Sequence, residues 1–288
     1  MMSFQFLHPD DATAMEQLNA FPGFKKMVKK FLSIGAENMQ YGINMASSIR
    51  LSPTQLSEIY NHLPPICQKL DLEVPEFYLV MNPIPNAYTF GDTRKNITVT
   101  SGLVKMLDSD EMAAVLAHEC GHILCHHVLY HSMADFLKMG VDALGILDPI
   151  TKPLQLAYQY WLRKSELSAD RVAAYVTSPE ITTRVMARLA GGPASLTQEV
   201  NLQEWASQAD IYEQIRTEGT FQKGLQMLAT AWLDHPFAVV RVREVLKWAQ
   251  TDEYCSLKMD NYIPKKCSCG ASIADDWSYC EHCGRKLT

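Results

Sequence analysis

The sequence lacks an uninterrupted apolar run long enough to cross a membrane. Its best candidate, residues 133–147, is broken by Asp135, Lys138 and Asp142, whereas a transmembrane helix needs about 18 or more apolar residues in succession. The first residues also lack the basic segment, apolar core and cleavage site of a secretory signal. We therefore expect a soluble cytosolic protein with no transmembrane segment.

A sustained basic stripe is missing as well. The net charge is −6 at neutral pH, with 47% apolar and 20% charged residues among 288. Binding to the phosphate backbone of nucleic acids depends on clustered lysine and arginine side chains, so we expect no nucleic-acid partner. The apolar content is typical of a globular chain with a packed core, rather than of a disordered one.

The remaining pattern predicts a predominantly helical α+β protein. Apolar residues recur at helical steps through residues 1–62, where Ser52-Pro53 signals a helix start. β-Branched and aromatic runs predict strands at residues 77–81, 87–90 and 97–100. Helical patterning returns at about 108–131, 154–177, 180–190, 198–216, 221–233 and 238–250. We therefore divide the chain into residues 1–62, 63–250, a linker at 251–265, and a cysteine-rich end at 266–288.

The helix beginning near Asp108 carries an H-E-x-x-H pattern, formed by His118, Glu119 and His122. Residues four apart lie on one helical face, so the two imidazoles can bind a single metal ion. A pair of hydrogen-bonded structural histidines is the alternative.

Three more histidines follow in the same apolar pattern. If the helix continues at 100° per residue, His127 and His131 lie on the opposite face and serve packing or hydrogen bonding. His126 lies on the ligand side, about 12 Å along the axis from His118, which is too far to share its ion. We expect His126 to line the site without completing it.

A catalytic zinc ion needs a third protein ligand and an open position for water. Of the downstream acids, only Glu166 and Asp170 form an i, i+4 pair on a clearly predicted helix. One of them could bind the metal while the other orients a ligand histidine. Exposed helix acids paired with Arg163 or Arg171 explain the spacing equally well.

With these motifs in order, the sequence resembles the zinc metallopeptidases that include HtpX-like proteases and the CAAX prenyl protease, sometimes called minigluzincins. The resemblance covers most of residues 40–250. It rests on the segments NAYTFG (86–91), ITVTSGLV (97–104), AHECGH (117–122), SELSADR (165–171) and DHPF (234–237). Because the chain lacks the membrane helices of those proteases, it resembles the soluble bacterial-type members more closely.

The resemblance implies a zincin-like domain, with a small mixed sheet packed on the H-E-x-x-H helix. Residues 1–62 would be its helical N-terminal segment and 63–250 its core. It also implies that zinc is held by His118, His122 and Glu166. In that arrangement Glu119 is the general base, and Asp170 does not bind the metal but contacts a side chain that does.

His235 is a candidate donor to the oxyanion of the reaction, because the family's His-Pro segment approaches the site. A hydrogen-bonded, helix-capping histidine is the alternative. Arg241 is a weaker candidate for the same role, and a salt bridge with Glu244 would explain it as well.

Peptide substrates often bind as an added strand, and residues 86–90 would offer the edge. We expect Asn86, Ala87 and Tyr88 to contact the substrate. A turn residue after Pro85 is the alternative reading of Asn86.

The last 22 residues contain four of the eight cysteines. They resemble a small zinc ribbon, in which a closed set of four thiolates binds a structural zinc ion. The expected ligands are Cys267, Cys269, Cys280 and Cys283, although the first pair is spaced C-x-C rather than C-x-x-C, so Cys255 or His282 could replace Cys267. A redox or disulfide pair is the alternative. Such a ribbon could recruit a protein partner.

These features predict a zinc metalloendopeptidase that hydrolyses protein or peptide substrates, with one catalytic zinc and one structural zinc. The alternative is a quality-control adaptor that binds substrates or partners and keeps a metal site with little turnover.

Overall fold

The computed structural model describes residues 5–33, 35–138, 152–217, 238–259, 265–266 and 272–273. The chain divides into two compact units, residues 1–249 and 250–288. The first unit contains α1 (Pro9–Ala20), α2 (Phe24–Ser33), α3 (Ala36–Ser47), β1 (Ile49–Arg50), α4 (Ser57–Tyr60), α5 (Leu63–Lys69), β2 (Glu76–Val80), β3 (Ala87–Phe90), β4 (Asn96–Thr100), α6 (Ser101–Met106), α7 (Ser109–Leu124), α8 (Val128–Lys138), α9 (Lys152–Val176), α10 (Pro179–Gly191), α11 (Ala194–Thr197), α12 (Leu202–Thr217) and α14 (Ala238–Trp248). The second unit contains α15 (Asp252–Met259), β5 (Lys265–Lys266) and β6 (Ser272–Ile273).

The sheet of the first unit is small and mixed, in the order β1-β2-β4-β3. β2 and β4 are parallel, whereas β1 and β3 pair antiparallel with their neighbours. All five residues of β4 are buried, which suits its alternation of Ile, Val and Thr. β3 forms one edge, and α7 and α8 pack against it. The predicted strands and the predominantly helical α+β class are confirmed.

The start of α7 follows its sequence signal. Asp108 accepts a hydrogen bond from the Glu111 backbone N–H at 2.8 Å, and Glu111 accepts one from the Asp108 N–H at 3.1 Å. This reciprocal capping box satisfies two backbone donors that the first turn leaves unpaired. The helix start that was predicted at Asp108 is confirmed.

The predicted continuation of this helix to residue 131 is wrong. α7 ends at Leu124, and His126 adopts a left-handed conformation with φ 60°. The His127 N–H bonds the His122 carbonyl at 2.9 Å, and the His126 N–H bonds the Ile123 carbonyl at 3.2 Å. This is the Schellman pattern of a helix end, which glycine usually provides. With histidine at that position, the sequence carried no visible stop signal.

The helix start predicted at Ser52-Pro53 is also wrong. The backbones of Ser52 and Gln55 bond each other at 3.0 and 3.1 Å, which closes a tight turn. Leu56 then adopts a left-handed conformation with φ 53°, so α4 begins only at Ser57. Hydrogen bonds between the residues around Pro53 therefore compete successfully with helix initiation.

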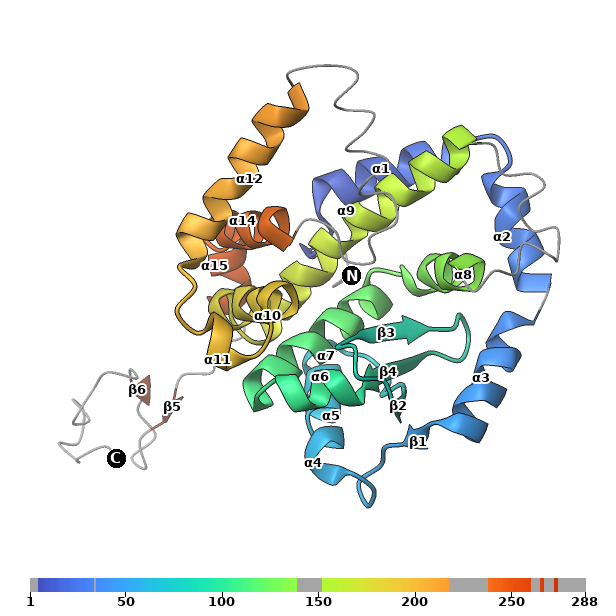
Figure 1. The fold of residues 1–288 in the computed structure, drawn as a ribbon, viewed down its shortest axis with the longest axis horizontal. Coiled ribbons are helices and arrows are strands. Elements are labelled where there is room, and N and C mark those ends of the chain that lie inside the picture. The colour runs from blue at the N-terminus through green and yellow to red at the C-terminus, as the bar shows by residue number, and fades with distance from the viewer. Residues whose placement is uncertain are drawn as a thin grey trace. The chain divides into compact units, whose positions relative to one another are not determined.

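The N-terminal helices belong to the main core of the first unit. α1 packs along α9, and α2 packs against α8 (Figure 1). Trp161 of α9, fully buried, lies in a cluster with Leu18, Phe24 and Met27. The first helix is thus held by apolar packing against the element that carries Glu166 and Asp170.

The remaining helix predictions have mixed outcomes. α9, α10, α12 and α14 confirm four of the predicted segments, within a few residues at each end. The helix predicted at 221–233 lies outside the described residues. Among the helices that are described, none is both long and apolar enough to cross a membrane.

Candidate metal centre

Two imidazoles and one carboxylate converge between α7 and α9. Nε2 of His118 lies 3.2 Å from Nε2 of His122. Each nitrogen also lies 3.4 Å from a carboxylate oxygen of Glu166, which reaches them from α9. All three side chains are buried, and their ligand atoms face one common point.

The spacing of these atoms fits zinc. Zinc binds nitrogen and oxygen ligands at about 2.0–2.2 Å with tetrahedral angles, which places neighbouring ligand atoms about 3.3–3.5 Å apart. The three distances, 3.2, 3.4 and 3.4 Å, lie close to that range. Three protein ligands also leave a fourth tetrahedral position open for water. His118, His122 and Glu166 could therefore hold a catalytic zinc ion.

Asp170 and Arg241 surround the ligands on the α9 side. Asp170 accepts from His118 Nδ1 at 2.9 Å, which leaves His118 Nε2 facing the common point. Arg241 of α14 donates to both oxygens of Asp170, from Nε at 2.7 Å and Nη2 at 2.6 Å. Its Nη1 lies 3.1 Å from Glu166. The alternative reading of Arg241, a salt bridge with Glu244, is thus wrong, because Arg241 pairs with Asp170 and Glu166 and Glu244 pairs with Arg243.

The electrostatics of this cluster favour a cation. Burial lowers the pKa of His118, but hydrogen bonds to Asp170 and Glu166 outweigh it and raise the pKa to about 10. Zinc binding requires the neutral form of His118. With His118 neutral, the ionised carboxylates of Glu119, Glu166 and Asp170 carry three buried negative charges against the single positive charge of Arg241. A buried charge is costly unless it is paired. A divalent ion would balance the two that remain.

Glu119 lies beside the two histidines on α7 and is 3% exposed. Thr89 of β3 donates a hydrogen bond from Oγ1 to Glu119 Oε2 at 2.5 Å. The hydroxyl fixes one carboxylate oxygen and leaves the other available. β3 thereby positions the acid of the H-E-x-x-H pattern.

A pocket opens beside His118 and Glu119, and its walls are mostly apolar. The pocket is lined by the start of β3, the residue before it, and helices α6, α7, α9, α10 and α14. Besides His118 and Glu119, the lining residues are Asn86, Ala87, Leu103, Ala114, Val115, Asp170, Ala173, Thr182, Val185, Met186, Leu189 and Arg241. Asn86 and Ala87 therefore line this pocket, whereas half-buried Tyr88 is not among the lining residues. Their contact with a substrate stays a prediction. Thr182 Oγ1 is buried and has no hydrogen-bond partner within the described part of the chain.

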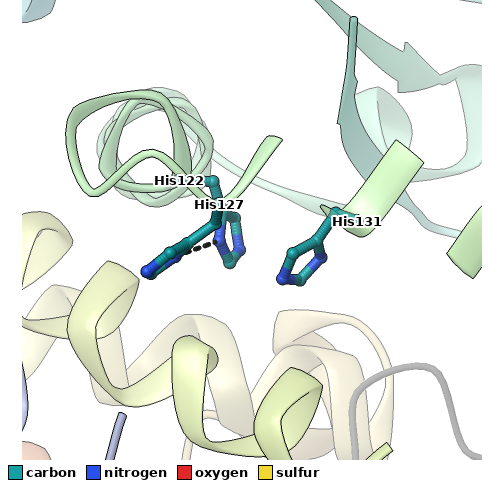
Figure 2. Close-up of side chains that lie close together, drawn as sticks. All are labelled: His122, His127 and His131. Atoms are coloured by element: carbon teal, nitrogen blue, oxygen red, sulfur yellow. Dashed lines mark hydrogen bonds between the residues drawn. The ribbon is translucent and has the colours of Figure 1, made fainter. Parts of the chain in front are cut away.

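The other histidines lie differently from the sequence prediction. Since α7 ends early, His127 and His131 turn towards His122 rather than away from it (Figure 2). Nδ1 of His127 lies 3.2 Å from Nδ1 of His122, and the ring of His131 lies 4.3 Å from that of His122. His126, expected to line the site, is exposed.

Several predicted residues lie outside the described part of the chain. They are His235 and the four cysteines Cys267, Cys269, Cys280 and Cys283. Their roles stay predictions.

Sequence reasoning missed Thr89 and gave Arg241 little weight. Period-two alternation in β3 places Thr89 on the same face as Ala87, so that spacing was an available signal. For Arg241 the signal was weaker, because its partners on α9 lie more than 70 residues away in the sequence. A buried arginine bonded to two acids can be read only from the folded chain.

Comparison with known proteins places this chain in a family. The model of Peptidase family M48 matches residues 53–249, well over half of the chain. The plastoglobule-localized metallopeptidase 48 of Arabidopsis thaliana chloroplasts is 34% identical over 260 residues, covering 88% of this chain and 74% of that protein. No solved structure matches the chain.

Bacterial relatives match shorter stretches. The protease HtpX homolog of Campylobacter concisus is 28% identical over 163 residues, covering 46% of this chain and 56% of that protein. The homolog of Tropheryma whipplei strain Twist is 33% identical over 105 residues, covering 36% and 35% respectively. The chain belongs to peptidase family M48, and it is a zinc metallopeptidase of the HtpX-like kind.

Proposed function

We propose that His118, His122 and Glu166 hold the catalytic zinc ion and that Glu119 is the general base of a metalloendopeptidase. The convergence of the three ligand atoms at 3.2–3.4 Å carries this proposal. Two imidazoles and one carboxylate suit zinc better than magnesium or calcium, which prefer oxygen ligands alone. When bound, zinc acidifies a water molecule and polarises the carbonyl of the scissile peptide bond.

Glu119 performs the proton transfers in this proposal. It takes a proton from the attacking water and later delivers that proton to the leaving amine, as a positioned carboxylate can. Thr89 holds Oε2, so that the other oxygen is the one directed to the reaction. The low exposure of Glu119 keeps bulk water from competing for the proton.

Asp170 and Arg241 keep the ligands in place. Asp170 fixes the ring of His118 through Nδ1, which makes Nε2 the metal-binding nitrogen. The fork of Arg241 in turn holds both oxygens of Asp170. We assign Arg241 to this positioning role. The oxyanion role remains with His235 as a proposal from the sequence.

The pocket and the sheet edge suggest how a substrate binds. Among the described strands, β3 lies at one end of the sheet order, so an extended peptide could add along it as a further strand. The substrate side chain next to the scissile bond would enter the pocket and contact Val115, Val185 and Met186. We propose peptide or protein substrates with an apolar residue at that position.

Glu119→Gln tests the proposed chemistry. The variant keeps the size of the side chain and the hydrogen bond from Thr89 but cannot take a proton. We expect unchanged zinc content and a loss of at least about a hundredfold in kcat on denatured casein, in line with removal of a general base. Lys105→Gln, on α6 and outside the site, is the matched control. Undiminished cleavage by Glu119→Gln would refute the assigned role.

The same assay decides between a protease and an adaptor. Cleavage that a chelator abolishes and zinc restores supports the protease. Binding of casein without cleavage by the wild-type protein would support the adaptor. We also retain as proposals the structural zinc of the cysteine-rich end, its use in recruiting a protein partner, and a cytosolic location.

A further inference from the structure

A buried acid of the first helix is connected to the second zinc ligand through His127. Asp11 of α1 is 1% exposed, and its Oδ2 lies 3.0 Å from His127 Nε2. Nδ1 of His127 lies 3.2 Å from Nδ1 of His122. Trp161 Nε1 and Ser168 Oγ of α9 also donate to Asp11, at 2.9 and 2.5 Å. A continuous row of hydrogen bonds thus runs from α1 to the metal ligand.

The direction of each proton in this row follows from the chemistry of its ends. If His122 binds zinc through Nε2, its Nδ1 carries the proton and must donate. His127 Nδ1 must then accept, so the His127 proton sits on Nε2 and is donated to Asp11. The Asp11 carboxylate accepts only, which fits all three of its donors. Every group in the row therefore has one consistent assignment.

We propose that Asp11 and His127 are positioning residues that fix the ring orientation and tautomer of His122 for zinc binding. The inference rests on the ligand set proposed above. Asp11 lies outside residues 53–249, the part of the chain that matches the family. The N-terminal helix is therefore part of the metal centre and contributes more than packing.

A second metal site is the competing reading of the same histidines. Ligand atoms of His122, His127 and His131 lie within 4.8 Å of one another (Figure 2). However, Ser165 donates to the Leu162 carbonyl at 2.8 Å, so it accepts from His131 Nε2 at 2.8 Å. His127 Nε2 is bonded to Asp11. A second ion would also need His122 to bridge two metals, so the hydrogen-bonded row is the simpler account.

The substitutions follow from the proton directions. Asp11→Asn replaces one of the two acceptor oxygens with an NH2 group, which can only donate. The variant can therefore accept a hydrogen bond from Trp161 or from His127, but not from both. His127→Leu removes the acceptor for His122. His127→Asn restores an acceptor, since its Oδ1 can occupy the place of the imidazole Nδ1. The matched control is Asp10→Asn, whose carboxylate is exposed and pairs with Lys164 at 2.6 Å.

The readout is zinc affinity of the full-length chain, measured by competition with a chelator. Subtracting the zinc bound by His118→Ala isolates the peptidase site from any other. Asp11→Asn and His127→Leu should bind zinc about 10- to 100-fold more weakly than the wild type. This is the usual effect of removing a residue that hydrogen-bonds to a metal-binding side chain. His127→Asn should recover most of the affinity that His127→Leu loses, and Asp10→Asn should match the wild type.

Thermal unfolding of the zinc-free variants separates positioning from packing. If Asp11→Asn lowers stability without zinc but leaves zinc affinity unchanged, the residue is structural and the proposal is overturned. Metal bound at His127 Nδ1, seen in the imidazole ¹⁵N spectrum of the zinc-loaded protein, would overturn it in favour of a second site. If His118→Ala still binds as much zinc as the wild type, the proposed ligand set itself fails.

Discussion

Gly121, inside the H-E-x-x-H pattern, lies where α7 packs tightly against α9. An added Cβ at this position would lie 2.9 Å from Ala169 Cα, 3.1 Å from the Ala169 carbonyl oxygen and 3.1 Å from Val172 Cβ. Ordinary carbon contacts are about 3.5–4.0 Å. Gly121→Ala therefore forces the two helices apart by about 0.5–1 Å, because two of the three neighbours are backbone atoms.

This displacement acts directly on the proposed ligands. His122 follows Gly121 on α7, and Glu166 lies one turn before Ala169 on α9. Metal sites tolerate deviations of only about 0.2 Å in ligand distances. We expect at least about a tenfold loss of zinc affinity, comparable to the effect of removing a residue that hydrogen-bonds to a metal-binding side chain. Overpacking costs about 1–3 kcal/mol, partly offset by the helix propensity of alanine, about 1 kcal/mol.

Gly42→Ala in α3 is the matched control. A Cβ there meets nothing within 4 Å, so only the propensity gain of up to about 1 kcal/mol remains. Zinc affinity by chelator competition and urea unfolding of both variants, with and without zinc, measure the two effects. If Gly121→Ala binds zinc like the wild type and is stabilised as much as Gly42→Ala, the close helix contact does not control the site.

Two further predictions concern selectivity and acid stability. Val185→Phe should narrow the pocket and lower kcat/KM for peptides with large apolar residues beside the scissile bond more than for small ones; an unchanged ratio would contradict the pocket assignment. His8, 3.8 Å from Glu244, together with Lys247 and Arg243, lowers the Glu244 pKa from 4.5 to about 2. This carboxylate therefore stabilises the fold above about pH 4.5, and its contribution disappears as pH falls towards 2. The free energy of unfolding in urea should depend less on pH for Glu244→Gln than for the wild type between those values. An identical dependence would show that the Glu244 carboxylate does not contribute to acid stability.

The parts of the fold that were predictable depend on local signals. The capping box at Asp108 and the apolar spacing set the start and face of α7. The strands at 77–81, 87–90 and 97–100 were visible from β-branched and aromatic runs between turn residues. Such signals act within a few residues of the chain, where the sequence itself is the environment.

The end of α7 was not predictable in this way. Its left-handed residue is His126, whereas glycine or asparagine is the usual sign of such an end. A non-glycine residue in this conformation is tolerated when surrounding contacts compensate for the strain. Here His127, buried and bonded to both Asp11 and His122, supplies such contacts.

The metal centre shows the same division between local and distant information. Helical spacing alone brings His118, Glu119 and His122 together. The Nδ1 atoms of the two imidazoles, however, have hydrogen-bond partners outside α7. His118 is oriented by Asp170 of α9, 52 residues away. His122 is oriented by His127, which reaches it only because α7 ends early, and His127 is in turn held by Asp11 of α1. A motif thus specifies which atoms can bind zinc, whereas the packing of α1 and α9 on α7 determines how those atoms are aimed.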